Sequence, residues 1–152
     1  MHGGTKDNIL CDHVELVGTV RTFDRDFRRS MPRRIEEIVR GAAAIYGCTA
    51  ECDYYFGPSP LINDDEELVA VAQGAARKQI GPDCLRPMEK MTGAEDFSVY
   101  LEHIPGVYGI RDRAKGIDCS NHHPAFLVDE EALHYGTGIY AQFAVDYLNG
   151  QK

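Results

Sequence analysis

The chain has 152 residues, 43% hydrophobic and 26% charged, proportions that suit one globular domain or two small lobes and exclude a disordered or fibrous protein. Its formal net charge of −8 argues against nucleic acid or an anionic membrane as a partner, because both attract basic surfaces. Five irregularly spaced cysteines argue against a disulfide framework, and without a long apolar run or a leader sequence the expected location is cytoplasmic.

The first third of the chain is expected to fold as strand, helix and strand. Residues 14–23 are rich in β-branched side chains, which predicts a strand, and apolar residues then recur every three or four positions over 24–46, which predicts an amphipathic helix. Gly47 is expected to end the helix, and 49–56 alternate as a second strand before a Gly-Pro-Ser-Pro break at 57–60. Two strands and one helix cannot close a large core, so this lobe needs further strands from elsewhere.

The rest of the chain is expected to form an α/β lobe. Asn63 or Asp64 is predicted to cap a helix that runs to about residue 79, because three acidic residues follow and favour the positive end of the helix dipole. Four further pieces are predicted: an extended piece at 85–88, helical turns at 94–103, a strand at 107–110 and a helix at 130–148.

Asn8 and Arg21 are the first candidate site residues. Asn8 ends a glycine-rich stretch, and Arg21 follows thirteen positions later in the predicted strand. An amide can donate a hydrogen bond to a developing oxyanion, and a guanidinium can bind a carboxylate through two hydrogen bonds. An Asx-turn at Asn8 and a surface salt bridge at Arg21 explain the same residues without a function.

Glu95 and Asp96 form an adjacent pair of carboxylates at a predicted helix start. The helix dipole alone explains acidic side chains in this position. The functional alternative is a carboxylate that orients a metal-bound imidazole from outside the ligand set.

His122 and His123 lie in a Pro-flanked segment before an acidic helix start. A neutral imidazole there suits zinc, but zinc takes three or four ligands, and the chain has no His-x-x-x-His or Cys-x-His to complete a set. Adjacent histidines in a strand would point to opposite sides, so one of them at most would face a given site. A hydrogen-bonding or surface pair is the alternative.

Taken in order, these segments resemble the C-terminal half of the zinc amidohydrolases that include hippurate hydrolase, N-acyl-amino-acid amidohydrolase and the auxin-conjugate hydrolases. That family has a glycine-rich stretch ending in Asn, a Gly-Thr-x-Arg strand, Asn-Asp before a helix, an acidic-Asp-Phe-Ser turn, a Pro-Gly strand, and His-x-Pro before an acidic helix start. The matching segments here are residues 3–8, 18–21, 63–64, 95–98, 105–106, 122–124 and 129–133.

The resemblance implies a two-lobed enzyme in which an α/β catalytic domain is interrupted by a smaller α+β lid domain that also dimerises. Residues 1–60 would be the second half of the lid, and 61–152 the C-terminal part of the zinc-exopeptidase-like catalytic domain. The implied assembly is a homodimer through the lid, and the implied substrate is a small N-acyl amino acid or peptide-like amide.

The resemblance also assigns roles to the candidate residues. His122 matches the family's last metal-ligating histidine, for zinc or another divalent metal such as manganese, cobalt or nickel. Asn8 would reach the scissile carbonyl and Arg21 the substrate carboxylate, both in the partner's site. Glu95, Asp96 and His123 would support the metal loop.

The departures from the family pattern concern the metal. The His-x-Asp, Cys-Gly-His-Asp and Glu-Glu segments of a complete member are absent, and with them the glutamate that acts as general base. This chain alone is therefore expected neither to hold zinc tightly nor to hydrolyse an amide. An internal start, an engineered truncation and a gene remnant all fit the sequence, and a catalytically dead dimerisation or binding module is the alternative function.

Overall fold

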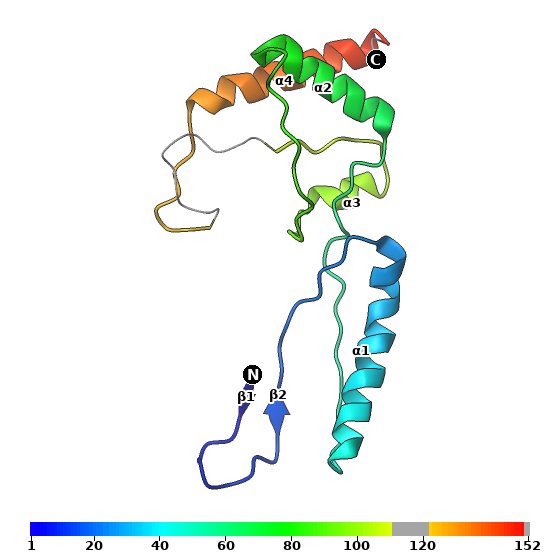
Figure 1. The fold of residues 1–152 in the computed structure, drawn as a ribbon, viewed down its shortest axis with the longest axis vertical. Coiled ribbons are helices and arrows are strands. Elements are labelled where there is room, and N and C mark those ends of the chain that lie inside the picture. The colour runs from blue at the N-terminus through cyan, green and yellow to red at the C-terminus, as the bar shows by residue number, and fades with distance from the viewer. Residues whose placement is uncertain (111–121, 151–152) are drawn as a thin grey trace. The chain divides into compact units, whose positions relative to one another are not determined.

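The computed structural model describes residues 1–110 and 122–150 (Figure 1). The chain divides into two compact units, Met1–Tyr55 and Phe56–Lys152, and each is described by itself.

The first unit begins with a very small hairpin. Strand β1 (His2–Gly3) pairs antiparallel with β2 (Val14–Glu15), with His2 opposite Glu15 and Gly3 opposite Val14. Gly3 is required by the packing, because a Cβ there would come within 2.9 Å of the Val14 side chain.

The predicted strands of the first unit form far less sheet than expected. The strand predicted over 14–23 is paired only at Val14–Glu15, and 49–56 have no ladder partner among the described residues. The physical reason is that a strand is stable only when its backbone groups hydrogen-bond to a neighbour, and the described part of this unit offers no further strand.

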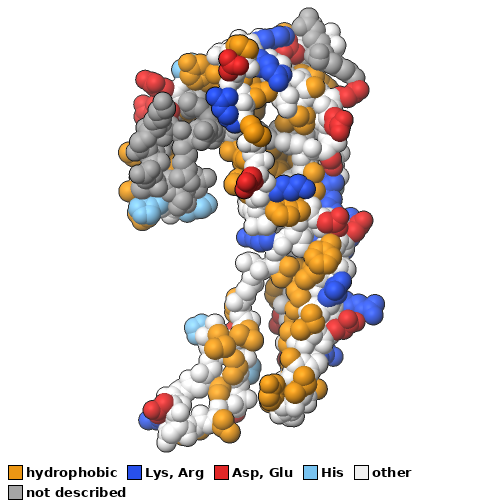
Figure 2. Space-filling view, viewed as in Figure 1, with side chains coloured by type: hydrophobic (Ala, Val, Ile, Leu, Met, Phe, Trp, Pro, Cys, Tyr) orange, Lys and Arg blue, Asp and Glu red, His pale blue; other side chains and the backbone are white. Residues whose placement is uncertain are grey.

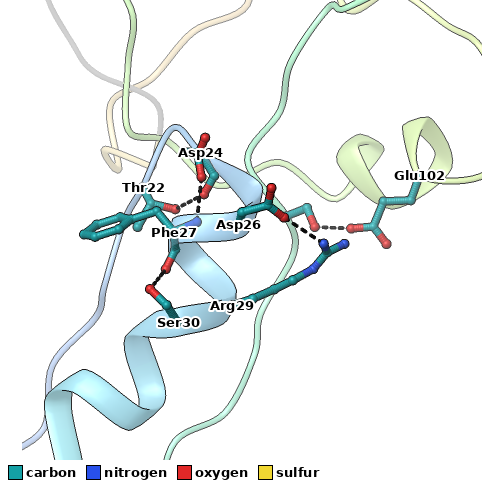
Figure 3. A network of polar contacts seen from close by, with 8 residues as sticks. Thr22, Asp24, Asp26, Phe27, Arg29, Ser30 and Glu102 are labelled. Atoms are coloured by element: carbon teal, nitrogen blue, oxygen red, sulfur yellow. Dashed lines mark hydrogen bonds and ion pairs between the residues drawn. The ribbon is translucent and has the colours of Figure 1, made fainter.

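Helix α1 (Arg25–Ile45) confirms the helix predicted over 24–46. The Asp24 carboxylate accepts a hydrogen bond of 2.6 Å from the backbone N–H of Phe27, which caps the helix (Figure 3). Gly47 ends it in the left-handed region at φ 70°, where glycine has no steric penalty, and the Cys48 N–H bonds back to the Ala43 carbonyl at 3.0 Å.

No residue of α1, the longest of the described helices, is buried. The helix therefore adds no side chain to a core of the described residues. Figure 2 shows hydrophobic side chains at the surface along this helix, and Phe27, Ile38 and Ile45 are among the exposed ones. The first unit therefore has an amphipathic helix whose apolar side lacks a covering layer among the described residues.

The second unit is built around two helices, α2 (Glu66–Ile80) and α4 (Glu131–Leu148), which pack side by side (Figure 1). Both confirm predicted helices. Leu68, Val71 and Ala75 of α2 are its buried apolar residues, and their spacing of three and four places them on one face. The predicted cap was wrong: Asp65, not Asn63 or Asp64, accepts from the Leu68 N–H at 2.9 Å.

A polar seam joins α2 to α4. The Lys78 ammonium lies 2.7 Å from the carboxylate of Asp146, which also accepts a hydrogen bond of 2.9 Å from the Gln142 amide. Gln79 donates to Gln142 at 3.3 Å. The hydrogen bonds from Lys78 and then Gln142 lower the pKa of Asp146, against an opposing effect of burial.

The segment between these helices contains α3 (Phe97–Leu101), within the predicted helical turns at 94–103. The strand predicted at 107–110 is wrong for the described residues, because no strand lies beside it. The Asn63 side chain takes the place of a partner strand: its amide donates to the Tyr108 carbonyl and accepts from the Tyr108 N–H, both at 2.9 Å. No helix in the described ranges is long and apolar enough to cross a membrane.

Candidate functional site

The hairpin loop and the segment before α1 carry the first two predicted site residues. Asn8 lies in the turn that joins β1 to β2, and Arg21 lies outside any helix or strand; both side chains are exposed. Neither forms a hydrogen bond or ion pair with another described residue. Their donors are therefore accessible, and the Asx-turn and the surface salt bridge considered for them are not seen in the described part of the chain.

Glu95 is held in place by the fold. One carboxylate oxygen accepts from the Phe97 N–H at 3.2 Å, and the other accepts from the Tyr108 hydroxyl at 3.0 Å. That second bond, followed by burial and by the negative charge of Glu95, raises the pKa of Tyr108. The Tyr108 ring also packs at 5.6 Å on Phe97. Glu95 thus ties the start of α3 to the Tyr108 segment.

Asp96 differs sharply from its neighbour. It occupies the N-cap position of α3 but makes no capping hydrogen bond, and its side chain is exposed. No other described residue pairs with its carboxylate. Of the two adjacent acids, Asp96 is the one whose oxygens are available to a group outside the described residues.

Tyr108 and Asn63 have roles that the sequence pattern does not reveal. The pattern predicts Asn63 as a helix cap and Tyr108 as a strand residue, whereas together they position Glu95. Gly106, just before, is packed so closely that a Cβ would lie 2.8 Å from Leu101. Gly106 is a signal of close packing, but nothing in the sequence points to Asn63 as the partner of Tyr108.

His122 and His123 lie in a turn and not in a strand. The expectation that adjacent histidines point to opposite sides therefore does not apply to them. His122 has φ 71°, an uncommon conformation for a residue with a Cβ. The His123 Nδ1 accepts from the Ala125 N–H at 3.1 Å, and its carbonyl accepts from the Phe126 N–H at 2.9 Å. His123 therefore closes the turn, and the exposed His122 imidazole has no described partner. Ser120 and Asn121, which precede the pair, lie outside the described residues.

Comparison with known proteins decides the family. The model of "Peptidase family M20/M25/M40" matches residues 4–146. The chain belongs to this peptidase family. The resemblance to amide-hydrolysing enzymes is thereby confirmed at the level of the family.

Relatives within the M20/M25/M40 family are hydrolases by name. The chain is 36% identical to an N-acetylcysteine deacetylase of Bacillus subtilis, over 100% of this chain and 39% of the relative. It is 33% identical to thermostable carboxypeptidase 2 of Saccharolobus solfataricus (98% and 38%) and 30% identical to the IAA-amino acid hydrolase ILR1-like 4 of Arabidopsis thaliana (96% and 34%). The chain thus spans less than two fifths of the length of these relatives. No solved structure matches it.

The zinc implied for this M20/M25/M40 chain does not fit the residues at hand. Within residues 1–110 and 122–150, no group of three or more His, Cys, Asp or Glu side chains is arranged to hold a metal ion. A zinc site needs three or four such ligands. Among the described residues, His122 belongs to no such group, and the Nδ1 of His123 accepts a hydrogen bond within its own turn.

Two open hollows of the second unit also lie away from the predicted residues. One has a volume of about 200 Å³ and is lined at the start of α2 by Asp65, Leu68 and Val71 together with Tyr147. The other lies between the same end of α2 and residues 101–106. None of the six predicted site residues lines either hollow.

Proposed function

We propose that this chain is the C-terminal part of a metal-dependent amidohydrolase that cleaves N-acyl amino acids or related amides with a free carboxylate, and that it is inactive alone. The observation that supports this most directly is that the family model matches residues 4–146, while the chain covers only 39% of the deacetylase relative. The named relatives include a deacetylase, a carboxypeptidase and an amino-acid-conjugate hydrolase.

Asn8 and Arg21 are proposed to act on the substrate in the partner's site. Asn8 would donate to the oxyanion that develops on the scissile carbonyl, and Arg21 would bind the substrate carboxylate. Both side chains are exposed and make no competing contacts with described residues, which supports the proposal. Substrate binding would satisfy donors that the described fold leaves available.

His122 is proposed to contribute one metal ligand in the complete enzyme, for zinc or a similar divalent ion. Its imidazole is exposed in a turn that His123 closes by a hydrogen bond. This supports different roles for the two histidines, with His122 as the ligand and His123 as the residue that holds the turn. Among the acids, Glu95 would support the site indirectly, because it joins the start of α3 to Tyr108. The available carboxylate of Asp96 would orient neighbouring groups.

The proposed architecture assigns residues 1–60 to the second half of an α+β lid that dimerises, and 61–152 to the C-terminal part of an α/β catalytic domain. The division between the two compact units falls shortly before this boundary, which supports it. A cytoplasmic location is proposed with it.

A catalytically dead dimerisation or binding module is the second candidate. Two observations favour it: the shortage of metal ligands among the described residues and the large exposed apolar side chains of the first unit. A module of this kind would bind a partner through the same surfaces and hydrolyse nothing.

The test is zinc binding and hydrolysis, measured on the same preparation. Isothermal titration with zinc should give a dissociation constant weaker than micromolar, and N-acetyl-L-cysteine should remain intact. Adding the part of the Bacillus subtilis relative that this chain does not match should restore hydrolysis, and the His122→Ala chain should restore much less. Sub-micromolar zinc binding by the chain alone would contradict the proposal, and no hydrolysis on addition would favour the binding module.

A further inference from the structure

Much of the apolar surface of α4 is exposed. Its one buried residue is an acid, Asp146, with 3% of its surface exposed. Several of its large apolar side chains are exposed, whereas Ile139 and Phe143 are partly buried: Leu133 is 59% exposed, Tyr140 79% and Leu148 82%. In a finished fold the apolar side of a helix usually faces a core, so an exposed apolar face can serve as a contact surface.

These exposed residues form a continuous stripe. Leu133 and Tyr140 are spaced seven apart, and seven residues fall within about 20° of two full turns. Together with Ala144 and Leu148 they follow one side of the helix for roughly 22 Å. We call these four residues the outer stripe. By their spacing, Gln142 and Asp146, which bond to Gln79 and Lys78 of α2, lie on the other side of the helix.

The outer stripe also lacks the charge that an exposed helix needs. After Glu131, α4 has no Asp, Glu, Lys or Arg other than Asp146, which is paired with Lys78. The exposed helix α1 shows the contrast, because ion pairs such as Arg33–Glu37 and Arg40–Glu36 cover its polar side. A solvated helix carries such charges, whereas a helix inside a protein does not.

The second unit is also short of internal partners. Its buried apolar residues among those described are only Leu68, Val71 and Ala75. The hydroxyl of Ser98 is buried without a hydrogen-bond partner among the described residues, which costs about 1–3 kcal/mol unless another group supplies one. Both observations fit a unit that packs against further polypeptide.

The relatives show how much polypeptide that is. The chain aligns over its whole length with only 39% of the Bacillus subtilis deacetylase, so most of that relative has no counterpart in residues 1–152. We infer that the outer stripe of α4 is the docking surface for a polypeptide equivalent to that unmatched part. The inference rests on the proposed function, since it takes the chain to be part of a larger hydrolase.

The test is co-purification and titration of the 152-residue chain with the unmatched part of the Bacillus subtilis relative, produced together in one cell. Tyr140→Arg and Leu133→Arg place a charge in the outer stripe without removing a buried contact. Gln73→Arg is the matched control, because it puts the same side chain on an exposed position of α2. The two stripe variants should bind at least about tenfold more weakly than wild type, and the control should bind as wild type does.

Circular dichroism at 222 nm on each variant separates loss of docking from loss of fold. Equal binding by wild type and Tyr140→Arg, or no binding by wild type, would overturn the inference. So would a wild-type homodimer that Tyr140→Arg converts to a monomer, because the occupant would then be a second copy. Stripe-dependent association without hydrolysis of N-acetyl-L-cysteine would support the docking surface while contradicting the proposed function.

Discussion

Each of the two units of this protein contains a helix with an Asp cap, but the two helices differ greatly in how far their side chains are buried. Helix α1 is 21 residues long, capped at its start and closed by a glycine at its end, yet none of its residues is buried. Helix α2 is 15 residues long and capped in the same way, and three of its apolar residues are buried. The comparison teaches that a helix can be specified locally, whereas a core needs a second element to pack against.

The largest expected effect comes from the core of the second unit. Leu68→Ala should destabilise α2 by about 2–3 kcal/mol, because it removes a side chain that is only 8% exposed. Ile38→Ala, at a position of α1 that is 68% exposed, should change stability by less than about 0.5 kcal/mol. Residue-resolved amide hydrogen exchange measures both. A large loss at Ile38 would show that α1 is covered in solution.

The polar seam should make the second unit sensitive to acid. The pKa of Asp146 is lower in the folded state than in the unfolded chain, so its contribution to stability is complete above the unfolded value of about 4. That contribution is lost as the pH falls through the folded pKa. Urea denaturation between pH 6 and 2 should show this loss in wild type and a smaller one in Asp146→Asn, and identical pH profiles would contradict the assignment.

The helix caps should behave alike in both units. Asp24→Ala and Asp65→Ala each remove a carboxylate that accepts one backbone N–H at the start of a helix, and each should cost about 1 kcal/mol. The measurement is amide exchange in the first turns of α1 and α2. Asn variants, which can still accept the bond, should recover most of the loss. Unequal losses would mean that packing also contributes to one of the caps.

The smallest expected difference in stability is between the loss of the Tyr108–Glu95 hydrogen bond and the loss of the Arg33–Glu37 ion pair within α1. Tyr108→Phe removes the hydrogen bond to Glu95 and should lower the stability of the second unit by about 0.5–1 kcal/mol. Glu37→Gln removes an exposed ion pair with Arg33 and should change α1 by only a few tenths of a kcal/mol. Thermal melts of both variants test this. Equal effects would show that the Tyr108 bond contributes no more than an exposed ion pair.

Much of the helical structure was predictable, because its signals are local. The apolar period and Gly47 at the end were enough to place α1 within one residue at each end. The strand predictions were poor for the opposite reason. Residues 49–56 and 107–110 have strand-like composition, but a strand exists only when another pairs with it, and the described residues supply none.

The candidate site was predictable only in part. The residue types and their order are enough to point to the family, and the family model confirms it. The difference between Glu95 and Asp96 was not predictable, because it depends on a bond from Tyr108. The roles proposed for Asn8, Arg21 and His122 stay predictions.

By itself, the sequence determined the helices, most of their ends and the family, since each depends on residues close together or on motifs in a set order. The tertiary structure alone decided the contacts across the second unit. Lys78 meets Asp146 across 68 positions, and Asn63 meets Tyr108 across 45. Such pairs are invisible in the sequence because their energy depends on how two distant segments pack, which no local pattern encodes.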